Sequence, residues 1–135
     1  MADSPKLTSA ANSPLGIGGS ASVNPDEFAR YLGLASWLMT MSEDHNELAL
    51  KVLDERILPA ILLKQFRMFS KGKMPIAFLT WAMVSDAVAE RLNQSGGTPE
   101  LKEWRTGKNL IIVDCVSPFG PVEKIKKEFL ASMKA

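Results

Sequence analysis

His45 is the only histidine in the chain, and it follows an apolar segment that carries a tryptophan, residues 37–41. A neutral imidazole is the side chain best suited to take a proton from an amine or a hydroxyl near neutral pH. It then needs an acceptor on its other ring nitrogen, which fixes the tautomer and stabilises the imidazolium ion. The plain alternative is a histidine that lies at the surface or caps a loop, so His45 alone defines no site.

Asp114 directly follows four apolar residues, 110–113, and such an unbroken run is typical of a strand buried on both faces. An ionised carboxylate beside a buried strand is costly unless a cation, hydrogen-bond donors or a catalytic role accounts for it. The alternative is an aspartate that accepts hydrogen bonds from the turn amides after it. A pair of His45 and Asp114 would form a base and the group that orients it, with no serine or cysteine nucleophile required.

Four other side chains are weaker candidates. Ser42 lies three residues before the histidine, where it could cap the next segment or bond the imidazole. Cys115 follows the aspartate and, by the two-residue period of a strand, points to the opposite face, where it fits a core thiol better than a nucleophile. Trp37 and Trp81 are predicted to be core residues or walls of a groove for an apolar chain.

The composition is that of one ordinary globular domain. The chain has 135 residues, a formal net charge of +1 and 46% hydrophobic residues, which favours neither a nucleic-acid-binding nor a disordered protein. A single cysteine excludes an internal disulfide and a cysteine-rich zinc site, so we expect no structural metal. The N-terminus does not resemble a secretory signal, and no apolar run approaches the roughly 18 residues of a transmembrane helix. We therefore expect a cytoplasmic protein.

The pattern of polar and apolar residues predicts a flexible tail over residues 1–23 and a folded domain over 24–135. Asn24 and Pro25 begin an amphipathic helix that runs to about residue 41, and Gly33 within it suggests close packing or an irregular turn. A second helical pattern covers residues 48–56, and Pro59 limits or kinks it.

The second half of the domain alternates strands and helices. Residues 64–69 and 74–84 are rich in β formers and predict a β-hairpin, and a third helix follows from Ser85 to Gly96. A short helical turn near residue 100, the strand before Asp114 and a last helix after Pro121 complete the chain. The order α-α-β-β-α-β-α predicts a mixed α/β fold with a mixed sheet covered by helices.

The last predicted helix carries a basic face with Lys124, Lys126, Lys127 and Lys134. Such a face is most often solvated surface. If it has a partner, an acidic carrier protein fits better than nucleic acid, because no base-stacking aromatic residues lie between the lysines.

Several short motifs follow one another between Tyr31 and Phe129. They are Leu32-Gly33, Ser36-Trp37-Leu38, Ser42-x-x-His45, Ile57-Leu58-Pro59-Ala60-Ile61, Pro75-Ile76-Ala77-Phe78, Trp81-Ala82, Glu103-Trp104-x-x-Gly107 and Val113-Asp114-x-Val116-x-Pro118-Phe119-Gly120. Taken together they resemble the toxin-activating lysine acyltransferases that modify RTX protoxins, the hemolysin-activating family. Several motifs in register are much more specific than any one of them alone.

The resemblance implies an acetyltransferase-like (GNAT-like) fold and transfer of a fatty acyl group from acyl-carrier protein to internal lysines of a protoxin. The family's essential histidine and aspartate fall on His45 and Asp114, and its supporting serine falls on Ser42. Trp37 and Trp81 would then line the acyl groove or belong to the core. The resemblance implies no bound cofactor, since the acyl donor, acyl-carrier protein, is a substrate. It also leaves open that the protein forms a homodimer.

Two points stay open within the resemblance. His45 would remove the proton of the lysine amine, or it would attack first and carry the acyl group itself. Arg56 stands where the family usually has asparagine, and typical members continue through another basic segment after the last matching helix. The alternative function is therefore a shortened, non-catalytic homologue that binds acyl-carrier protein or another partner, and a third is a small acyltransferase acting on a free amine.

Overall fold

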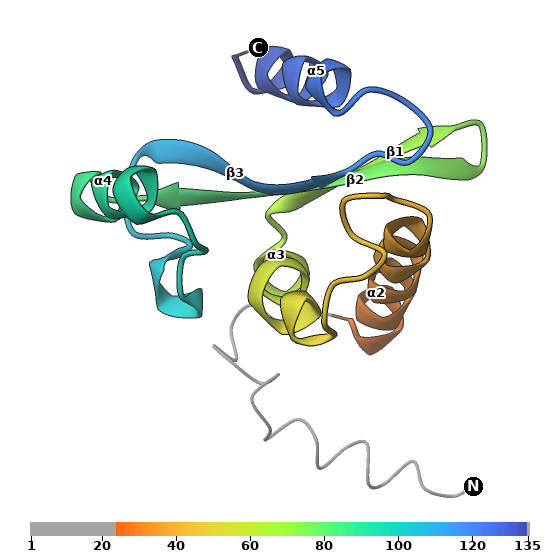
Figure 1. The fold of residues 1–135 in the computed structure, drawn as a ribbon, viewed down its shortest axis with the longest axis horizontal. Coiled ribbons are helices and arrows are strands. Elements are labelled where there is room, and N and C mark those ends of the chain that lie inside the picture. The colour runs from red at the N-terminus through yellow and green to blue at the C-terminus, as the bar shows by residue number, and fades with distance from the viewer. Residues whose placement is uncertain (1–23, 135) are drawn as a thin grey trace, which may run out of the picture.

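The computed structural model describes residues 24–134, in which an antiparallel sheet of three strands carries helices on both faces (Figure 1). The strands are β1 (Phe66–Lys71), β2 (Met74–Val84) and β3 (Asn109–Val116), and β2 lies between the other two. The mixed α/β class is as predicted. The predicted tail, residues 1–23, lies outside the described residues.

The expected mixed sheet is wrong, because both strand pairs are antiparallel. Strands β1 and β2 are joined by a tight turn at Gly72, whose φ of 64° suits glycine. The chain leaves β2 at Val84 and returns opposite it at Asn109, after α4 (Asp86–Ser95) and the 3₁₀ turn η5 (Leu101–Glu103). This return to the same end of β2 makes β3 antiparallel.

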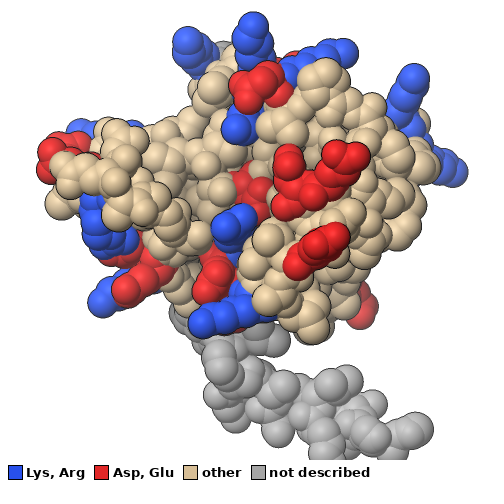
Figure 2. Space-filling view, viewed as in Figure 1, with Lys and Arg blue, Asp and Glu red and all other residues tan. Residues whose placement is uncertain are grey.

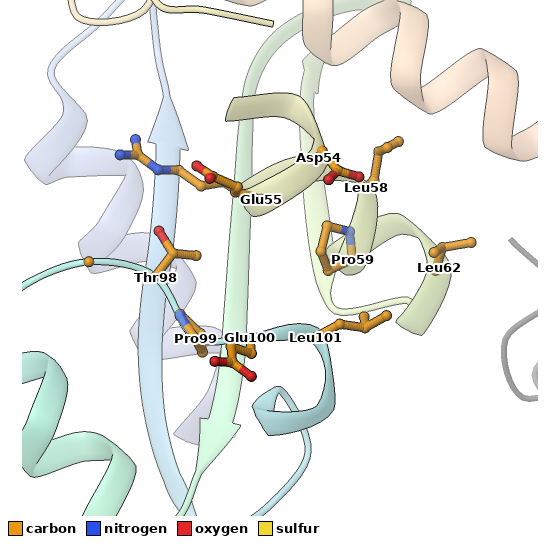
Figure 3. A pocket seen from close by; sticks show the side chains of 11 residues that line it. Asp54, Glu55, Leu58, Pro59, Leu62, Thr98, Pro99, Glu100 and Leu101 are labelled. Atoms are coloured by element: carbon orange, nitrogen blue, oxygen red, sulfur yellow. The ribbon is translucent and has the colours of Figure 1, made fainter. Parts of the chain in front are cut away.

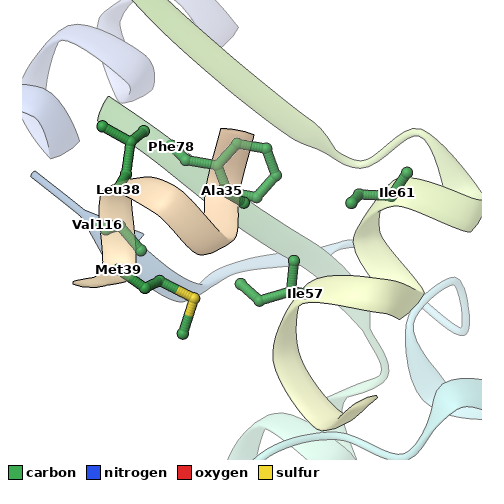
Figure 4. Close-up of a cluster of buried hydrophobic side chains, with 7 residues drawn as sticks. All are labelled: Ala35, Leu38, Met39, Ile57, Ile61, Phe78 and Val116. Atoms are coloured by element: carbon green, nitrogen blue, oxygen red, sulfur yellow. The ribbon is translucent and has the colours of Figure 1, made fainter. Parts of the chain in front are cut away.

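Helix α2 (Pro25–Thr40) begins where it was predicted. The side chain of Asn24 accepts hydrogen bonds from the N–H groups of Asp26 and Glu27, at 2.8 and 3.4 Å. The expected close packing at Gly33 is wrong, since a Cβ added there would meet nothing within 4 Å. The buried face of α2 packs on the sheet and on the helix that follows (Figure 4), and this cluster comprises Ala35, Leu38, Met39, Ile57, Ile61, Phe78 and Val116.

The second helical region differs from the prediction at both ends. It contains a π-helical turn, η4 (Leu53–Ile57), that continues into α3 (Leu58–Leu63). Leu48, which was expected to begin its apolar face, is exposed. Pro59 does not end the helix, because it lies in the first turn of α3, where the missing N–H would have no partner in any case.

The two faces of the sheet are covered by different helices, as Figure 1 shows. Helix α5 (Val122–Lys134) covers one face and packs with a cluster of Ala77, Leu79, Cys115, Ile125 and Phe129. The opposite face packs on α2, η4 and α3, and farther along it on a cluster around the buried Trp104. Apolar residues of β3 therefore meet neighbours on both faces, as predicted, although as an edge strand it is mostly half-buried.

Candidate active site

His45 lies in the middle of a buried chain of hydrogen bonds. Its Nδ1 lies 2.6 Å from Ser42 Oγ, and its Nε2 lies 2.7 Å from Asp114 Oδ1. Ser42 and His45 are only 6% and 7% exposed. An ionised carboxylate can only accept hydrogen bonds, so Nε2 carries a proton, and in the neutral imidazole Nδ1 accepts the Ser42 hydroxyl. The basic nitrogen of His45 is therefore Nδ1, and it accepts the hydrogen bond of the Ser42 hydroxyl.

The turns that follow α2 place the histidine. The Ser42 N–H donates to Met39 O at the end of the helix, at 3.2 Å. The N–H groups of His45 and Asn46 then both donate to Ser42 O, at 3.0 and 2.9 Å. These bonds attach the imidazole to the end of a helix whose buried face is fixed on the sheet, so the ring has a defined position.

A β-bulge in β3 turns Asp114 toward the histidine. Thr80 pairs with Asp114, but the next residue of β2, Trp81, pairs with Ile112, so Val113 is the extra residue. Val113 packs in the cluster around Trp104, while Ile112 packs under α5. Without the bulge, strict alternation would place Asp114 on the α5 face, away from His45.

The carboxyl group of Asp114 is ionised by its surroundings. Burial acts to raise its pKa, but the hydrogen bond and charge of His45 act against this, together with the Cys115 N–H at 2.7 Å and the Arg56 guanidinium. These groups outweigh burial, and the pKa of Asp114 is lowered from its ordinary value. Asp114 is therefore a carboxylate near neutral pH, as an orienting group for an imidazolium must be.

Arg56 joins the site to an open groove, and Figure 3 shows the other side chains that line this groove. Its Nη1 lies 3.4 Å from Asp114 Oδ2, and it also lines a cavity of about 620 Å³ between the η4–α3 segment and residues 97–101. The apolar walls of this groove are Leu58, Pro59, Leu62, Pro99 and Leu101, and its acidic residues are Asp54, Glu55 and Glu100. The groove thus begins one side chain away from the pair of His45 and Asp114.

The remaining predicted candidates lie elsewhere. Trp81 packs against Phe129 beneath α5, with ring centroids 5.0 Å apart, on the face of the sheet opposite Asp114. Trp37 is 42% exposed, and neither tryptophan lines the groove. Cys115 is buried under α5, and burial raises the pKa of its thiol to about 11. This is the core thiol that was predicted.

Two residues near the site were not predicted from the sequence. In the sequence, Arg56 stands out only as a departure from a family pattern. The one signal that Thr80 leaves is a hydroxyl within the apolar run from Phe78 to Ala82. Within residues 24–134, no group of three or more His, Cys, Asp or Glu side chains could hold a metal ion. No helix in this part of the chain is long and apolar enough to span a bilayer.

The charged residues on the face shown in Figure 2 are unevenly distributed. Lysine and arginine side chains gather along the edge formed by α5, where Lys124 and Lys127 are exposed. Acidic side chains gather over the layer of α2 and α3. The basic helix face predicted from the sequence is therefore solvated surface on the side of the sheet away from His45.

This fold and site define a class: an α/β protein with a buried histidine–aspartate pair suited to acid–base chemistry. Comparison with known protein families identifies it further. The model of the RTX toxin acyltransferase family matches residues 24–134, and the chain belongs to that family.

Individual relatives agree with this assignment. The chain is 30% identical over 95 residues to the protein-lysine myristoyltransferase RtxC of Kingella kingae, which covers 70% of this chain and 56% of the relative. It is 35% identical over 91 residues to the leukotoxin-activating lysine-acyltransferase LktC of a Pasteurella haemolytica-like species, covering 66% and 54%. An uncharacterized Synechocystis protein, sll0720, is 28% identical over 98 residues, covering 71% and 67%. The chain thus spans about half the length of the first two relatives.

Proposed function

We propose that this protein transfers a fatty acyl group from acyl-carrier protein to the ε-amino group of lysines in an RTX-type protoxin, in the cytoplasm. Family membership and the names of the relatives, which are lysine acyltransferases, support the reaction class. The observation that carries the proposal is the buried chain of hydrogen bonds from Ser42 through His45 to Asp114.

His45 acts as the base in this reaction. A neutral lysine amine attacks the carbonyl carbon of the thioester and must then lose a proton. That proton passes to Ser42 Oγ while the Ser42 hydroxyl proton moves to His45 Nδ1, and Asp114 stabilises the imidazolium ion. As the carbon–sulfur bond breaks, the proton returns by the same path to the thiolate of the carrier. Atoms and charges balance, and no further reactant is needed.

A second route uses the same atoms in another order. His45 Nδ1 attacks the thioester carbon and the carbon–sulfur bond breaks, which gives an acyl-imidazolium, stabilised by Asp114, and a thiolate. The neutral lysine amine then attacks the acyl carbon, the bond from that carbon to Nδ1 breaks, and the proton lost by the amine goes to the thiolate. Because Ser42 Oγ lies 2.6 Å from Nδ1, the serine must rotate away for this attack. The first route keeps the observed hydrogen bonds and is the one we favour.

The groove is the proposed place for the acceptor lysine. Its apolar walls suit the four methylene groups of a lysine side chain, and the carboxylates of Asp54, Glu55 and Glu100 would attract its ammonium group, which loses a proton to solvent before the neutral amine attacks. The basic face of α5 is the proposed dock for the acidic carrier protein. Helix α5 packs against β3, the edge strand that bears Asp114, so the carrier arm would reach the site around that edge.

The proposal is tested with the whole chain, acyl-loaded carrier protein and a lysine-bearing acceptor, with transfer followed by intact mass. His45→Ala should lower the transfer rate by about 10³-fold or more, because the base is lost. Asp114→Asn should lower it by about 10³- to 10⁴-fold, because the amide can donate to Nε2 and so leave the proton on Nδ1. Glu43→Gln, an exposed change in the same turn, is the matched control and should transfer normally.

The outcomes separate the alternatives. Normal transfer by a folded His45→Ala protein overturns the proposal. A stable acyl adduct on the wild-type protein that is absent from His45→Ala would favour the acyl-imidazole route. Carrier binding without any transfer by the wild-type chain would instead identify a non-catalytic homologue.

A further inference from the structure

Thr80 carries a buried hydroxyl that its surroundings do not account for. The residue is 0% exposed, and among residues 24–134 its Oγ1 has no hydrogen-bond partner. A buried hydroxyl without a partner costs free energy, whereas a valine of the same shape at this position would not. Packing alone therefore gives no reason for a threonine between Leu79 and Trp81.

The position of Thr80 provides such a reason. It lies directly opposite Asp114 in the pairing of β2 with β3, beside the bulge. Directly opposed residues of an antiparallel pair have their side chains on the same face, with Cβ atoms about 4.5–5.5 Å apart. This face is the one on which His45 and Arg56 reach Asp114. Thr80 is thus a neighbour of the carboxylate that orients the histidine.

The carboxylate of Asp114 has room for another donor. Its Oδ1 accepts both short hydrogen bonds, from His45 Nε2 and from the Cys115 N–H, each at 2.7 Å. Among the described residues, Oδ2 has one polar contact, with Arg56 Nη1 at 3.4 Å, and the Arg56 side chain is 35% exposed. An ionised carboxylate accepts about four hydrogen bonds, so Oδ2 can take another donor from within the protein.

We propose that Thr80 is a positioning residue, whose hydroxyl donates to Asp114 Oδ2 as the site forms the imidazolium ion and so holds the carboxylate toward His45 Nε2. A rotation of about 120° about the Cα–Cβ bond of Thr80 carries the hydroxyl to the position of the methyl group and the methyl group to that of the hydrogen, with the backbone unchanged. The inference rests on the proposed function of His45, to which it adds a residue that touches neither substrate.

Two variants test this inference: Thr80→Val removes the hydroxyl with little change in volume, and Thr80→Ser keeps it. Thr80→Val removes the proposed hydrogen bond from the Thr80 hydroxyl to the charged Asp114 carboxylate, so we expect it to lower kcat about 10-fold with KM unchanged. The same variant should unfold at an equal or higher temperature than the wild-type chain. Thr80→Ser should retain kcat within about 3-fold, which a purely structural role of the methyl group would not produce.

A second measurement does not depend on acyl transfer. His45 is the only histidine, so the Nε2–H proton bonded to Asp114 can be followed by NMR without ambiguity. With the ring in its imidazolium form, at the lowest pH at which the chain stays folded, we expect its exchange with solvent to be about 10-fold faster in Thr80→Val and close to wild type in Thr80→Ser. Unchanged exchange and kcat in Thr80→Val would overturn the inference. Changed exchange in a protein that transfers no acyl group would support the role of Thr80 and reject the proposed function.

Discussion

At the scale of single residues, the reactivity of His45 depends on what its two neighbours donate and accept. Asp114 accepts from Nε2, which leaves the lone pair of the neutral ring on Nδ1. The Ser42 hydroxyl donates a hydrogen bond to this lone pair, with Oγ 2.6 Å from Nδ1, so a proton that reaches Nδ1 along this bond passes through the hydroxyl. The serine therefore does more than cap a helix end, because its hydroxyl holds the nitrogen on which the proposed proton transfer depends.

Cys115 provides a prediction at the same scale, because it is adjacent to Asp114 yet on the other face of the sheet. Burial raises the pKa of its thiol to about 11, so the reactive thiolate is scarce in the folded protein. We expect iodoacetamide to leave the native chain unmodified at mildly alkaline pH and to label this single cysteine in denaturant. Intact mass measures both. Fast labelling of the native protein would show an accessible thiolate and contradict the burial of Cys115.

The same thiol affects the pH dependence of stability. The folded state holds its proton more tightly than the unfolded state, whose thiol has the ordinary pKa of 9.0. This contribution is fully present below pH 9.0 and is lost as pH rises toward about 11, because unfolding then releases a proton. The stability difference between wild type and Cys115→Ala should therefore shrink over that interval in urea unfolding. A constant difference would mean that the thiol has no raised pKa.

At the scale of elements, local features were predictable from the sequence and long-range features were not. Asn24 and Ser85 cap helices through hydrogen bonds to residues two or three positions away, so the local pattern revealed them. The bulge at Val113 depends on how β2 pairs with β3, and the passage of a helix through Pro59 depends on a π-helical turn. Neither leaves a periodic signal, and so the groove and the contact of Arg56 with Asp114 could not be predicted.

Gly107 supports a prediction about the loop that leads into β3. A Cβ at this position would overlap Val84 O and lie 2.5 Å from the backbone of Ser85, and backbone atoms cannot move aside cheaply. The Gly107 N–H also donates to Met83 O, at 3.2 Å. We therefore expect Gly107→Ala to lower the free energy of unfolding by about 3 kcal/mol, measured by urea unfolding.

The matched control is the same substitution at Gly33, within α2. Nothing lies within 4 Å of a Cβ there, and alanine is the better helix former. Gly33→Ala should therefore raise the free energy of unfolding by about 1 kcal/mol. If Gly107→Ala and Gly33→Ala lowered the free energy of unfolding equally, the close backbone contacts at Gly107 would not explain the loss.

At the scale of the whole molecule, the two layers of helices share one sheet. Strand β2 contributes Ala77 and Leu79 to the cluster under α5 and Phe78 to the cluster under α2. Strand β3 similarly has Cys115 on one face and Asp114 on the other. Because the same short strands support both layers, neither layer can lose its packing without weakening the other, and the domain should unfold as one unit.

Phe129 tests this cooperativity from the layer that lies away from the site. Its ring is fully buried, and Phe129→Ala should lower the free energy of unfolding by about 3–5 kcal/mol. Leu130, the next residue on α5, is 39% exposed, and Leu130→Ala should cost less than about 1 kcal/mol. Native-state hydrogen exchange measures where the loss appears. In one cooperative unit, the slowest amides of α2 and β2 lose as much protection in Phe129→Ala as those of α5. Loss confined to α5 would instead show a helix that docks on an independently stable sheet, with the pair of His45 and Asp114 insulated from it.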